Sequence, residues 1–393
     1  MLLVAPQPLF DDRGTPIAVR QVLEALSELG YRVDVLTYPM GRRRQIPCVR
    51  LLRALNPFGL RRVPVGFSLR KVLLDSSLVV GLAGLLSEQH YLCVHAVEEA
   101  AFPALLLARR RGIPVIYDMQ SSLPEQLRLH PLLGLSLAQR VIVRLERWLL
   151  TRADLIVSSA GLSSHVRHVK PDANVREWRF PGVHLDSAPA ERDELRRSLG
   201  IADGARVVLY GGTFQGYQGL PELLEAVPLV RCRAPDTVFV LVGGESGDTI
   251  RGWSEDASDA LAGAVVFVRR QPKERMAAFL SMADVLVSPR AWGGNVPLKV
   301  FDYLASGRPI VATDIRSHRA VLTEERALLV RPTASGLAGG ILDLLSDPAR
   351  AARLGDAARA YADARLAWPT FVSSVGELYD DARALRTQRG ERD

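Results

Sequence analysis

Residues 283–314 combine an apolar strand, a glycine-rich loop and a helix in an order that suits an anion site. The apolar run ends at Ser288, the loop holds Trp-Gly-Gly-Asn at 292–295, and Pro297 suits the first turn of the helix that follows. The free N–H groups and the dipole at such a helix start attract anions. We therefore expect this segment to bind a diphosphate group.

Three charged side chains stand on or beside this helix start. Arg290 precedes the loop, and Lys299 lies in the first helical turn, where the dipole mildly disfavours a cation unless an anion is bound. Asp302 carries the oxygens that could accept hydrogen bonds from ribose hydroxyls. The alternative interpretation is an ordinary strand–loop–helix crossover without a ligand.

Strands and helices alternate along the chain, as in parallel sheets covered by helices. Strands are expected at residues 1–6, 32–37, 92–95, 114–118 and 155–158, and again at 206–210, 237–242, 264–268, 285–288 and 309–312. Helices are expected at 16–30, 138–152, 220–230, 273–282 and 298–306, with a last helical stretch from 349 to about 385. Turn formers at 179–190 mark a linker. The pattern predicts two parallel-sheet domains with a ligand cleft at the carboxyl ends of their strands.

Length and composition agree with two domains, because 393 residues suit two units of ~150–200 residues each. The three cysteines, Cys48, Cys93 and Cys232, are too few and too far apart for a disulfide framework or a zinc site, which favours a reducing compartment. No apolar run reaches the ~18–20 residues that span a bilayer. The opening MLLVAP lacks the features of a secretory signal. We expect a cytoplasmic protein, at most peripheral on the inner face of the cell membrane.

The net charge of +7 comes mostly from arginine. One cluster contains Arg42, Arg43, Arg44, Arg50, Arg53, Arg61, Arg62, Arg70 and Lys71. Two interpretations stand side by side: a surface for anionic lipid headgroups or a phosphate-bearing acceptor, and a solvated face without a partner. No nucleic acid partner is expected, since no reading module is recognisable. The helix at 138–152 also has an apolar stripe opposite its arginines, and packing of this stripe on a sheet is favoured over lying on a membrane. The stripe consists of Ala138, Val141, Ile142, Leu145, Trp148 and Leu149.

The segment DYLASGRPIVA at 302–312 resembles the donor-binding motif of glycosyltransferase family 4, a large retaining family with the GT-B fold. Members usually carry two glutamates eight positions apart, before an A-x-G helix and a strand of the type PVVA. Asp302 matches the second acidic position, which binds the ribose in the family. Gly294 falls on the first, so the usual carboxylate toward the donor sugar is missing. The form SPR…NxPLK resembles a variant subgroup, in which Asn295 and Lys299 take part of that work.

The resemblance covers nearly the whole chain. Gly14 and Thr15 match the loop that faces the donor phosphates and the acceptor. Further matches are residues 181–186 with the family's hinge, 210–224 with the first strand and helix of the donor domain, and 368–379 with the last helix. The resemblance implies an α/β GT-B fold with two Rossmann-like parallel-sheet domains facing across a cleft. Their expected bounds are 1–183 for the acceptor side, 184–367 for the donor side, and 368–393 for a helix that crosses back onto the N-terminal domain.

Several positions depart from the family pattern. The family's phosphate-binding arginine and lysine correspond to Thr213 and Gln218, whose neutral side chains cannot offset a diphosphate's charge. Arg290, Lys299 or the pair at 269–270 must then substitute. The expected active-site histidine corresponds to Gln120, which can hydrogen-bond a sugar hydroxyl but cannot move a proton. For His95, a satisfied buried histidine is the favoured interpretation.

The resemblance thus implies catalytic roles for Gln120, Arg290 and Lys299. It implies donor-binding roles for Gly14, Thr15, Gly212, Thr213, Gln218, Arg269, Arg270, Asn295, Val296, Pro297, Leu298 and Asp302. No metal site and no cofactor are expected, and the donor substrate would be a UDP- or GDP-sugar.

The expected reaction moves a sugar from a nucleoside-diphosphate sugar to a hydroxyl acceptor, with retention, in cell-surface glycan or polysaccharide biosynthesis. The basic N-terminal half suggests a lipid-linked glycan at an anionic membrane as acceptor. Two alternatives remain. One is an inactive homologue that assists a partner transferase, suggested by the simultaneous losses at 120, 213, 218 and 294. The other is a nucleotide-sugar epimerase, which lacks a supporting pair of a carboxylate and a histidine.

Overall fold

The computed structural model describes residues 1–57, 59–61, 63, 68–128, 130, 133–183, 185, 189–244, 261 and 263–391. The chain divides into two compact units. Unit 1 comprises Met1–Trp178 and Pro369–Asp393, and unit 2 comprises Arg179–Trp368. The domain limits that the sequence predicted, after residue 183 and after residue 367, stay predictions. Of the hinge expected at 181–186, residues 184 and 186 lie outside the described part.

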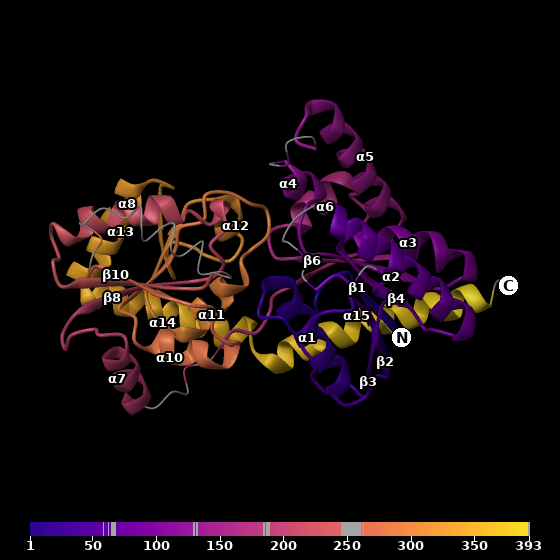
Figure 1. The fold of residues 1–393 in the computed structure, drawn as a ribbon, viewed down its shortest axis with the longest axis horizontal. Coiled ribbons are helices and arrows are strands. Elements are labelled where there is room, and N and C mark those ends of the chain that lie inside the picture. The colour runs from indigo at the N-terminus through magenta and orange to yellow at the C-terminus, as the bar shows by residue number, and fades with distance from the viewer. Residues whose placement is uncertain are drawn as a thin grey trace. The chain divides into compact units, whose positions relative to one another are not determined.

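Unit 1 is built on a seven-stranded sheet, in which every pairing is parallel (Figure 1). The strands in spatial order are β3 (Val49–Arg53), β2 (Val33–Thr37), β1 (Leu2–Ala5), β4 (Val94–Val97), β5 (Val115–Met119), β6 (Leu155–Ser159) and β7 (Val175–Trp178). The helices are α1 (Gly14–Glu28), α2 (Leu69–Glu88), α3 (Ala101–Leu107), α4 (Leu123–Leu127), α5 (Ser136–Arg152) and α6 (Ser163–Val169), with short 3-10 turns at Glu98–Ala100 and Arg109–Arg111.

The two faces of this sheet are covered by different helices because side chains alternate along each strand. Val94 and Ala96 of β4 belong to the core that α2, α3, α5 and α6 complete. His95 points to the opposite face, where it meets Tyr379 of the last helix, α15 (Trp368–Gly390). The prediction that the C-terminal helix crosses back onto the N-terminal domain is confirmed, because α15 from Pro369 onward belongs to unit 1 (Figure 1).

Unit 2 contains a six-stranded sheet whose pairings are also all parallel. The strands in spatial order are β10 (Val265–Val268), β9 (Thr237–Val242), β8 (Arg206–Gly211), β11 (Val285–Ser288), β12 (Ile310–Thr313) and β13 (Leu328–Val330). The helices are α7 (Pro189–Ser198), α8 (Leu220–Arg231), α10 (Met276–Ser281), α11 (Leu298–Ser306), α12 (Arg316–Arg319), α13 (Ala334–Ser346) and α14 (Pro348–Arg365), with 3-10 turns at Gly216–Gln218 and Lys273–Arg275. Helices α8, α13 and α14 close one core with this sheet.

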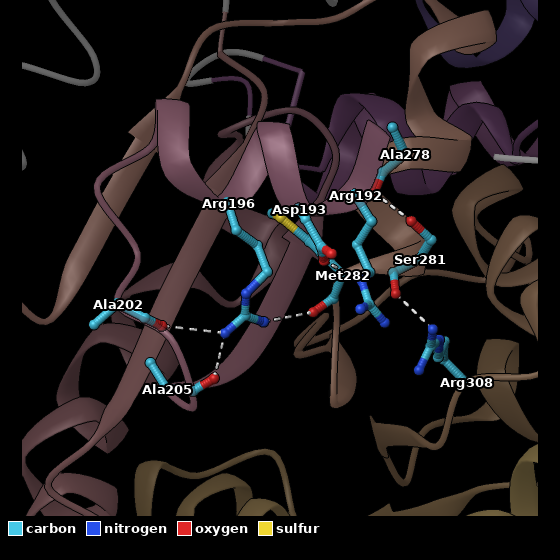
Figure 2. Close-up of polar contacts among 9 residues, drawn as sticks. All are labelled: Arg192, Asp193, Arg196, Ala202, Ala205, Ala278, Ser281, Met282 and Arg308. Carbon is cyan, nitrogen blue, oxygen red and sulfur yellow. Dashed lines mark hydrogen bonds and ion pairs between the residues drawn. The ribbon is translucent and has the colours of Figure 1, made fainter. Parts of the chain in front are cut away.

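Helix α7 opens unit 2, and arginine–carbonyl bonds fix it in place. Figure 2 shows Arg196 donating to the carbonyl oxygens of Ala205, at 2.6 Å, and of Met282, at 3.4 Å. Beside them, Arg308 donates to the carbonyl of Ser281 at the end of α10. These bonds satisfy carbonyls that the end of α10 and the adjacent loops leave unpaired.

Among the described residues, no helix is both long and apolar enough to cross a membrane.

Candidate functional site

The carboxyl ends of β8 and β11 lie at the same edge of the unit 2 sheet because the two strands are parallel neighbours. The loop after β11 leads into α11, which begins at Leu298 with Pro297 in an extended conformation as its N-cap. The loop after β8 contains Gly212, Thr213 and Gln218. The segment expected to bind a diphosphate therefore adjoins the loop that the family resemblance assigned to donor phosphates.

Arg290 organises the loop after β11. Its guanidinium donates to the carbonyl of Trp292 at 2.9 Å, and to the carbonyl and side-chain oxygens of Asn295 at 2.8 and 2.9 Å. It also lies over the ring of Tyr217, 5.2 Å from the centroid. Gly293 has a φ of +133°, and a Cβ there would come within 2.2 Å of the guanidinium. Glycine at 293 thus lets the loop wrap closely around a buried arginine.

Lys299 is the central cation of this edge. Its Nζ lies 3.9 Å from the centroid of the Tyr210 ring and donates to Oε1 of Gln218 at 3.1 Å. Within the described part of the chain, no carboxylate pairs with this ammonium group. Burial lowers the pKa of Lys299 well below its usual value, and the charge of nearby Arg290 lowers it further. A positive group in this position gains from any anion that joins it.

Gln218 and Lys299 together explain one departure from the family pattern. Gln218 stands where the family has a phosphate-binding lysine, and the ammonium of Lys299 reaches the end of the Gln218 side chain. A positive charge is thus present beside position 218, although it comes from another helix. At Thr213, the carbonyl oxygen accepts a hydrogen bond from the Tyr210 hydroxyl at 2.7 Å.

Asp302 has its nearest partners in unit 2 itself. One carboxylate oxygen accepts the N–H of Val183 at 2.9 Å and lies 3.6 Å from Nζ of Lys273. Burial raises the pKa of Asp302, and Lys273 and the Val183 N–H oppose that effect. Sequence reasoning missed Lys273, and no motif could have found it, because the contact depends on how the 3-10 turn at Lys273–Arg275 packs beside α11.

The remaining donor-side residues divide into two groups. Val296 and Pro297 are buried, and Leu298 is half-buried at the first turn of α11. Arg269 and Arg270 follow β10, an edge strand separated from β11 by β9 and β8. The pair at 269–270, which the sequence offered as an alternative source of charge, thus follows a strand that does not adjoin β11.

Gln120, Gly14 and Thr15 belong to unit 1. Gln120 is buried after β5, and its amide Nε2 donates to Oδ1 of Asp118 at 2.6 Å. The other oxygen of Asp118 lies 3.2 Å from Nε2 of His95, whose Nδ1 meets the hydroxyl of Tyr379 at 2.7 Å. His95 is therefore a satisfied buried histidine, as expected. Gly14 is exposed and begins α1, and Thr15 is half-buried beside it.

His318 is another buried histidine with a structural position. Its Nε2 lies 2.9 Å from the Ser288 hydroxyl, and its Nδ1 lies 2.7 Å from the carbonyl of Thr313. Burial lowers its pKa to about 3, so the ring is neutral at physiological pH. It ties the end of β11 to the end of β12 and so supports the edge that bears Arg290. Among the described residues, no group of three or more His, Cys, Asp or Glu side chains is arranged to hold a metal ion.

In comparisons with known proteins, both halves of the chain match family models of glycosyltransferases. Residues 191–361 match the family model of the glycosyl transferases group 1, and residues 13–177 match that of the glycosyl transferase 4-like domain. The chain is 34% identical over 220 residues to a GDP-mannose-dependent alpha-(1-6)-phosphatidylinositol monomannoside mannosyltransferase of Mycolicibacterium smegmatis, covering 52% of this chain and 56% of that protein. It is 27% identical over 307 residues to a D-inositol 3-phosphate glycosyltransferase of Streptomyces avermitilis, covering 72% of this chain and 64% of that protein. The alignments thus span between about half and two thirds of these relatives' own lengths.

Two solved structures share the fold over almost the entire chain. A sucrose-phosphate synthase from Thermosynechococcus elongatus superposes with a TM-score of 0.82 at 22% identity, covering 98% of both chains. The Anabaena protein HepE, solved in complex with UDP-glucose, superposes with a TM-score of 0.75 at 16% identity, covering 96% of this chain and 98% of that one. The predicted GT-B fold, with two Rossmann-like parallel-sheet domains, is confirmed.

Proposed function

Because both halves of the chain carry glycosyltransferase domains, a 4-like domain at 13–177 and a group 1 domain at 191–361, we propose that it transfers a glycosyl unit from a nucleoside-diphosphate sugar to a hydroxyl acceptor. The donor is a UDP- or GDP-sugar, and the configuration at the anomeric carbon is retained. The relative named for a GDP-mannose donor and the HepE complex with UDP-glucose support this donor class.

The observation that carries the proposal is the pair of positive groups at the edge of the unit 2 sheet. Lys299 is half-buried, and no carboxylate of the described residues pairs with it, which leaves a cation that costs free energy in the absence of an anion. Arg290 adds a second positive charge close by, and the N-terminus of α11 adds the positive end of its dipole. A diphosphate would offset all three.

These positive groups can offset the negative charge that develops on the departing diphosphate during the reaction. The bond between the anomeric carbon and the diphosphate oxygen breaks, and the bond to the acceptor oxygen forms on the same face. The acceptor's proton passes to the departing phosphate oxygen, so no protein base is needed. Lys299, Arg290 and the N–H groups at the start of α11 stabilise the departing diphosphate, a form of electrostatic stabilisation that is often the largest contribution to catalysis.

Asp302 would bind the ribose. One of its oxygens is held by Val183 and Lys273, which fixes the orientation of the carboxylate. The second oxygen is then available to accept hydroxyl hydrogen bonds. Asn295 lies in the loop that leads into α11, and Arg290 holds its side chain. Asn295 takes the sugar-facing role of the missing acid at Gly294.

The acceptor that we propose is a lipid-linked glycan at an anionic membrane surface, in cell-surface glycan or polysaccharide biosynthesis. The relative named for a phosphatidylinositol monomannoside supports a lipid-linked acceptor. The location that fits is the cytoplasm, at the inner face of the cell membrane. All three cysteines are free, which suits a reducing compartment.

A second candidate function is a donor-binding homologue without turnover, which assists another transferase. One observation favours it: the amide N–H of Gln120 is engaged by Asp118, at the position where the family has its active-site histidine.

The test is incubation of the purified chain with a panel of labelled nucleotide sugars, with and without vesicles that contain polyprenyl-linked glycans. The proposal expects release of the nucleoside diphosphate and transfer of label from one donor, abolished by Asp302→Ala. Binding of a donor without release under any condition would favour the second candidate. Interconversion of the nucleotide sugar itself would indicate an epimerase.

A further inference from the structure

Helix α5 (Ser136–Arg152) leaves an apolar stripe exposed on the surface of unit 1, at the upper end of that unit in Figure 1. Leu137, Val141 and Leu145 follow one another at four-residue spacing, so their side chains line one side of the helix. Their exposed fractions are 72%, 47% and 44%. The sequence pattern placed Val141 and Leu145 in a stripe that packs on the sheet, and here the structure differs.

The buried side of α5 is a different one. Ile142, Leu149 and Leu150 are buried, together with the carboxylate of Glu146. Glu146 accepts the N–H of Leu123 at 2.7 Å and meets His165 at 2.6 Å, which joins α5 to α4 and α6. Packing therefore accounts for one side of α5, and the stripe Leu137–Val141–Leu145 lies outside it.

A row of arginines borders the exposed stripe. Arg140 and Arg144 are four residues apart, and Arg147 completes the row; all three are exposed. Within the described residues, no partner engages any of their guanidinium groups. The helix thus presents a row of apolar side chains beside a row of unpaired positive charges.

The basic cluster at 42–71, which the sequence suggested as a surface for anionic lipid headgroups, differs from the α5 row in the partners of its charged side chains. Arg42 pairs with Asp12 at 2.7 Å, Arg50 with Asp34, and Lys71 with Glu99. Arg53 donates to several main-chain carbonyl oxygens. Much of the charge of this cluster is therefore engaged within unit 1, whereas that of the α5 row is available to a partner.

We propose that the exposed side of α5, formed by Leu137, Val141, Leu145 and the arginines at 140, 144 and 147, docks on the surface of an anionic phospholipid bilayer. An interfacial helix needs an apolar side that enters the headgroup boundary and basic residues beside it that meet anionic lipids. Arginine suits the flank, because its aliphatic stem lies along apolar surface while the guanidinium reaches the headgroups. The inference rests on the proposed function for its purpose, which is to bring unit 1 to a lipid-linked acceptor, but binding itself needs no turnover.

The test is cosedimentation of the full chain with mixed phosphatidylcholine–phosphatidylglycerol vesicles and with pure phosphatidylcholine vesicles. We expect binding to the mixed vesicles that weakens with added salt, and much weaker binding to the neutral ones. A membrane-adjacent basic residue contributes about fivefold, so R140Q/R144Q/R147Q should bind on the order of 100-fold more weakly. The charge-retaining R140K/R144K/R147K should keep most of the binding, and L137S/V141S/L145S should lose it.

A matched control changes three exposed arginines of unit 2, as R233Q/R353Q/R365Q, and removes the same net charge. This control should bind as the wild type does. Equal binding to neutral and anionic vesicles, an equal loss in the control, or no loss in R140Q/R144Q/R147Q would overturn the proposal. A change in self-association of the α5 variants without vesicles would overturn it in favour of a second copy of the chain.

The membrane-docking proposal and the proposed function can each be refuted without the other. Release of nucleoside diphosphate in the absence of vesicles should be the same in the wild type and in R140Q/R144Q/R147Q, since α5 bears no donor-binding residue. If vesicle binding follows the expected order while no donor is turned over, the docking surface stands and the proposed function falls.

Discussion

Exchanging the residues at 218 and 299 probes the proposed donor site most sharply. The Nζ of Lys299 lies 3.1 Å from Oε1 of Gln218, so the same place can be reached from either position. Lys299→Gln removes the positive charge. Adding Gln218→Lys restores it from the other side and keeps a lysine–glutamine hydrogen bond. A cation-specific role therefore predicts loss in the single variant and recovery in the double variant.

The expected magnitude follows from the bond that is lost. A hydrogen bond to a charged group contributes about 1.5–3 kcal/mol, so Lys299→Gln should weaken binding of a nucleoside diphosphate roughly 10- to 150-fold. The effect on folding should be small. Removing a half-buried charge stabilises the fold and so offsets the loss of the contact with Tyr210 and of the bond to Gln218. The exchanged variant should recover most of the affinity.

Titration calorimetry with UDP and GDP measures this directly, and thermal melting without ligand serves as the control for folding. The reasoning would be refuted if Lys299→Gln bound the diphosphate as tightly as the wild type. It would also be refuted if both variants lost affinity in step with a large drop in melting temperature, since Lys299 would then be a structural residue.

Three further predictions concern unit 2. Asp302→Ala should weaken binding of the nucleotide roughly tenfold or more, because a charge-assisted hydrogen bond is lost. Calorimetry measures this affinity, and an unchanged value would contradict the ribose-binding role of Asp302. Gly293→Ala should destabilise unit 2 by about 2 kcal/mol, because the new Cβ would lie 2.2 Å from the Arg290 guanidinium at a φ of +133°. The melting temperature should then fall by roughly 4–8 °C. An unchanged melting temperature would contradict this packing. His318 has a pKa lowered to about 3, against about 6.5 when unfolded, so only the unfolded state takes up the proton in that window. The free energy of unfolding of unit 2 should fall as the pH drops from about 6.5 towards 3, by up to about 1.4 kcal/mol per pH unit. In denaturant unfolding at several pH values, His318→Gln should make this dependence on pH less steep. A dependence as steep as that of the wild type would contradict the prediction.

Much of the fold could be read from the sequence because buried parallel strands form short apolar runs between turn formers. The strand at Val285–Ser288 and the helix at Leu298–Ser306 were predicted almost to the residue. Strand β3 (Val49–Arg53) was missed, because its arginines read as part of a basic surface. Its position at the edge of the sheet leaves both faces partly exposed, so no continuous apolar run marks it.

The sequence singles out the residues of the candidate site but not the contacts that they make. Arg290, Lys299 and Asp302 stand out by their spacing around a helix start, which is a local property of the chain. The contacts of Lys299 with Gln218 and of Asp302 with Lys273 join segments far apart in the sequence. They depend on how β8 and β11 pair and how the turn at Lys273–Arg275 packs, and a single sequence carries no signal for either.

The exposed stripe of α5 illustrates the same limit. Its apolar residues cover more than one side of the helix, and periodicity alone does not show which side meets the sheet. The burial of Ile142 and the bonds of Glu146 settle the orientation, and they leave Val141 and Leu145 exposed.

The measurement that tests the central claim most directly is the proton balance of diphosphate binding. Burial and Arg290 lower the pKa of Lys299, and a bound diphosphate would raise it again. Calorimetric titration of UDP and GDP at a series of pH values, in buffers of different ionisation enthalpy, should therefore show net proton uptake that Lys299→Gln removes. The corresponding monophosphates should bind more weakly and take up fewer protons. Binding of neither diphosphate at millimolar concentration, or diphosphate binding whose proton balance is unchanged by Lys299→Gln, would contradict the account.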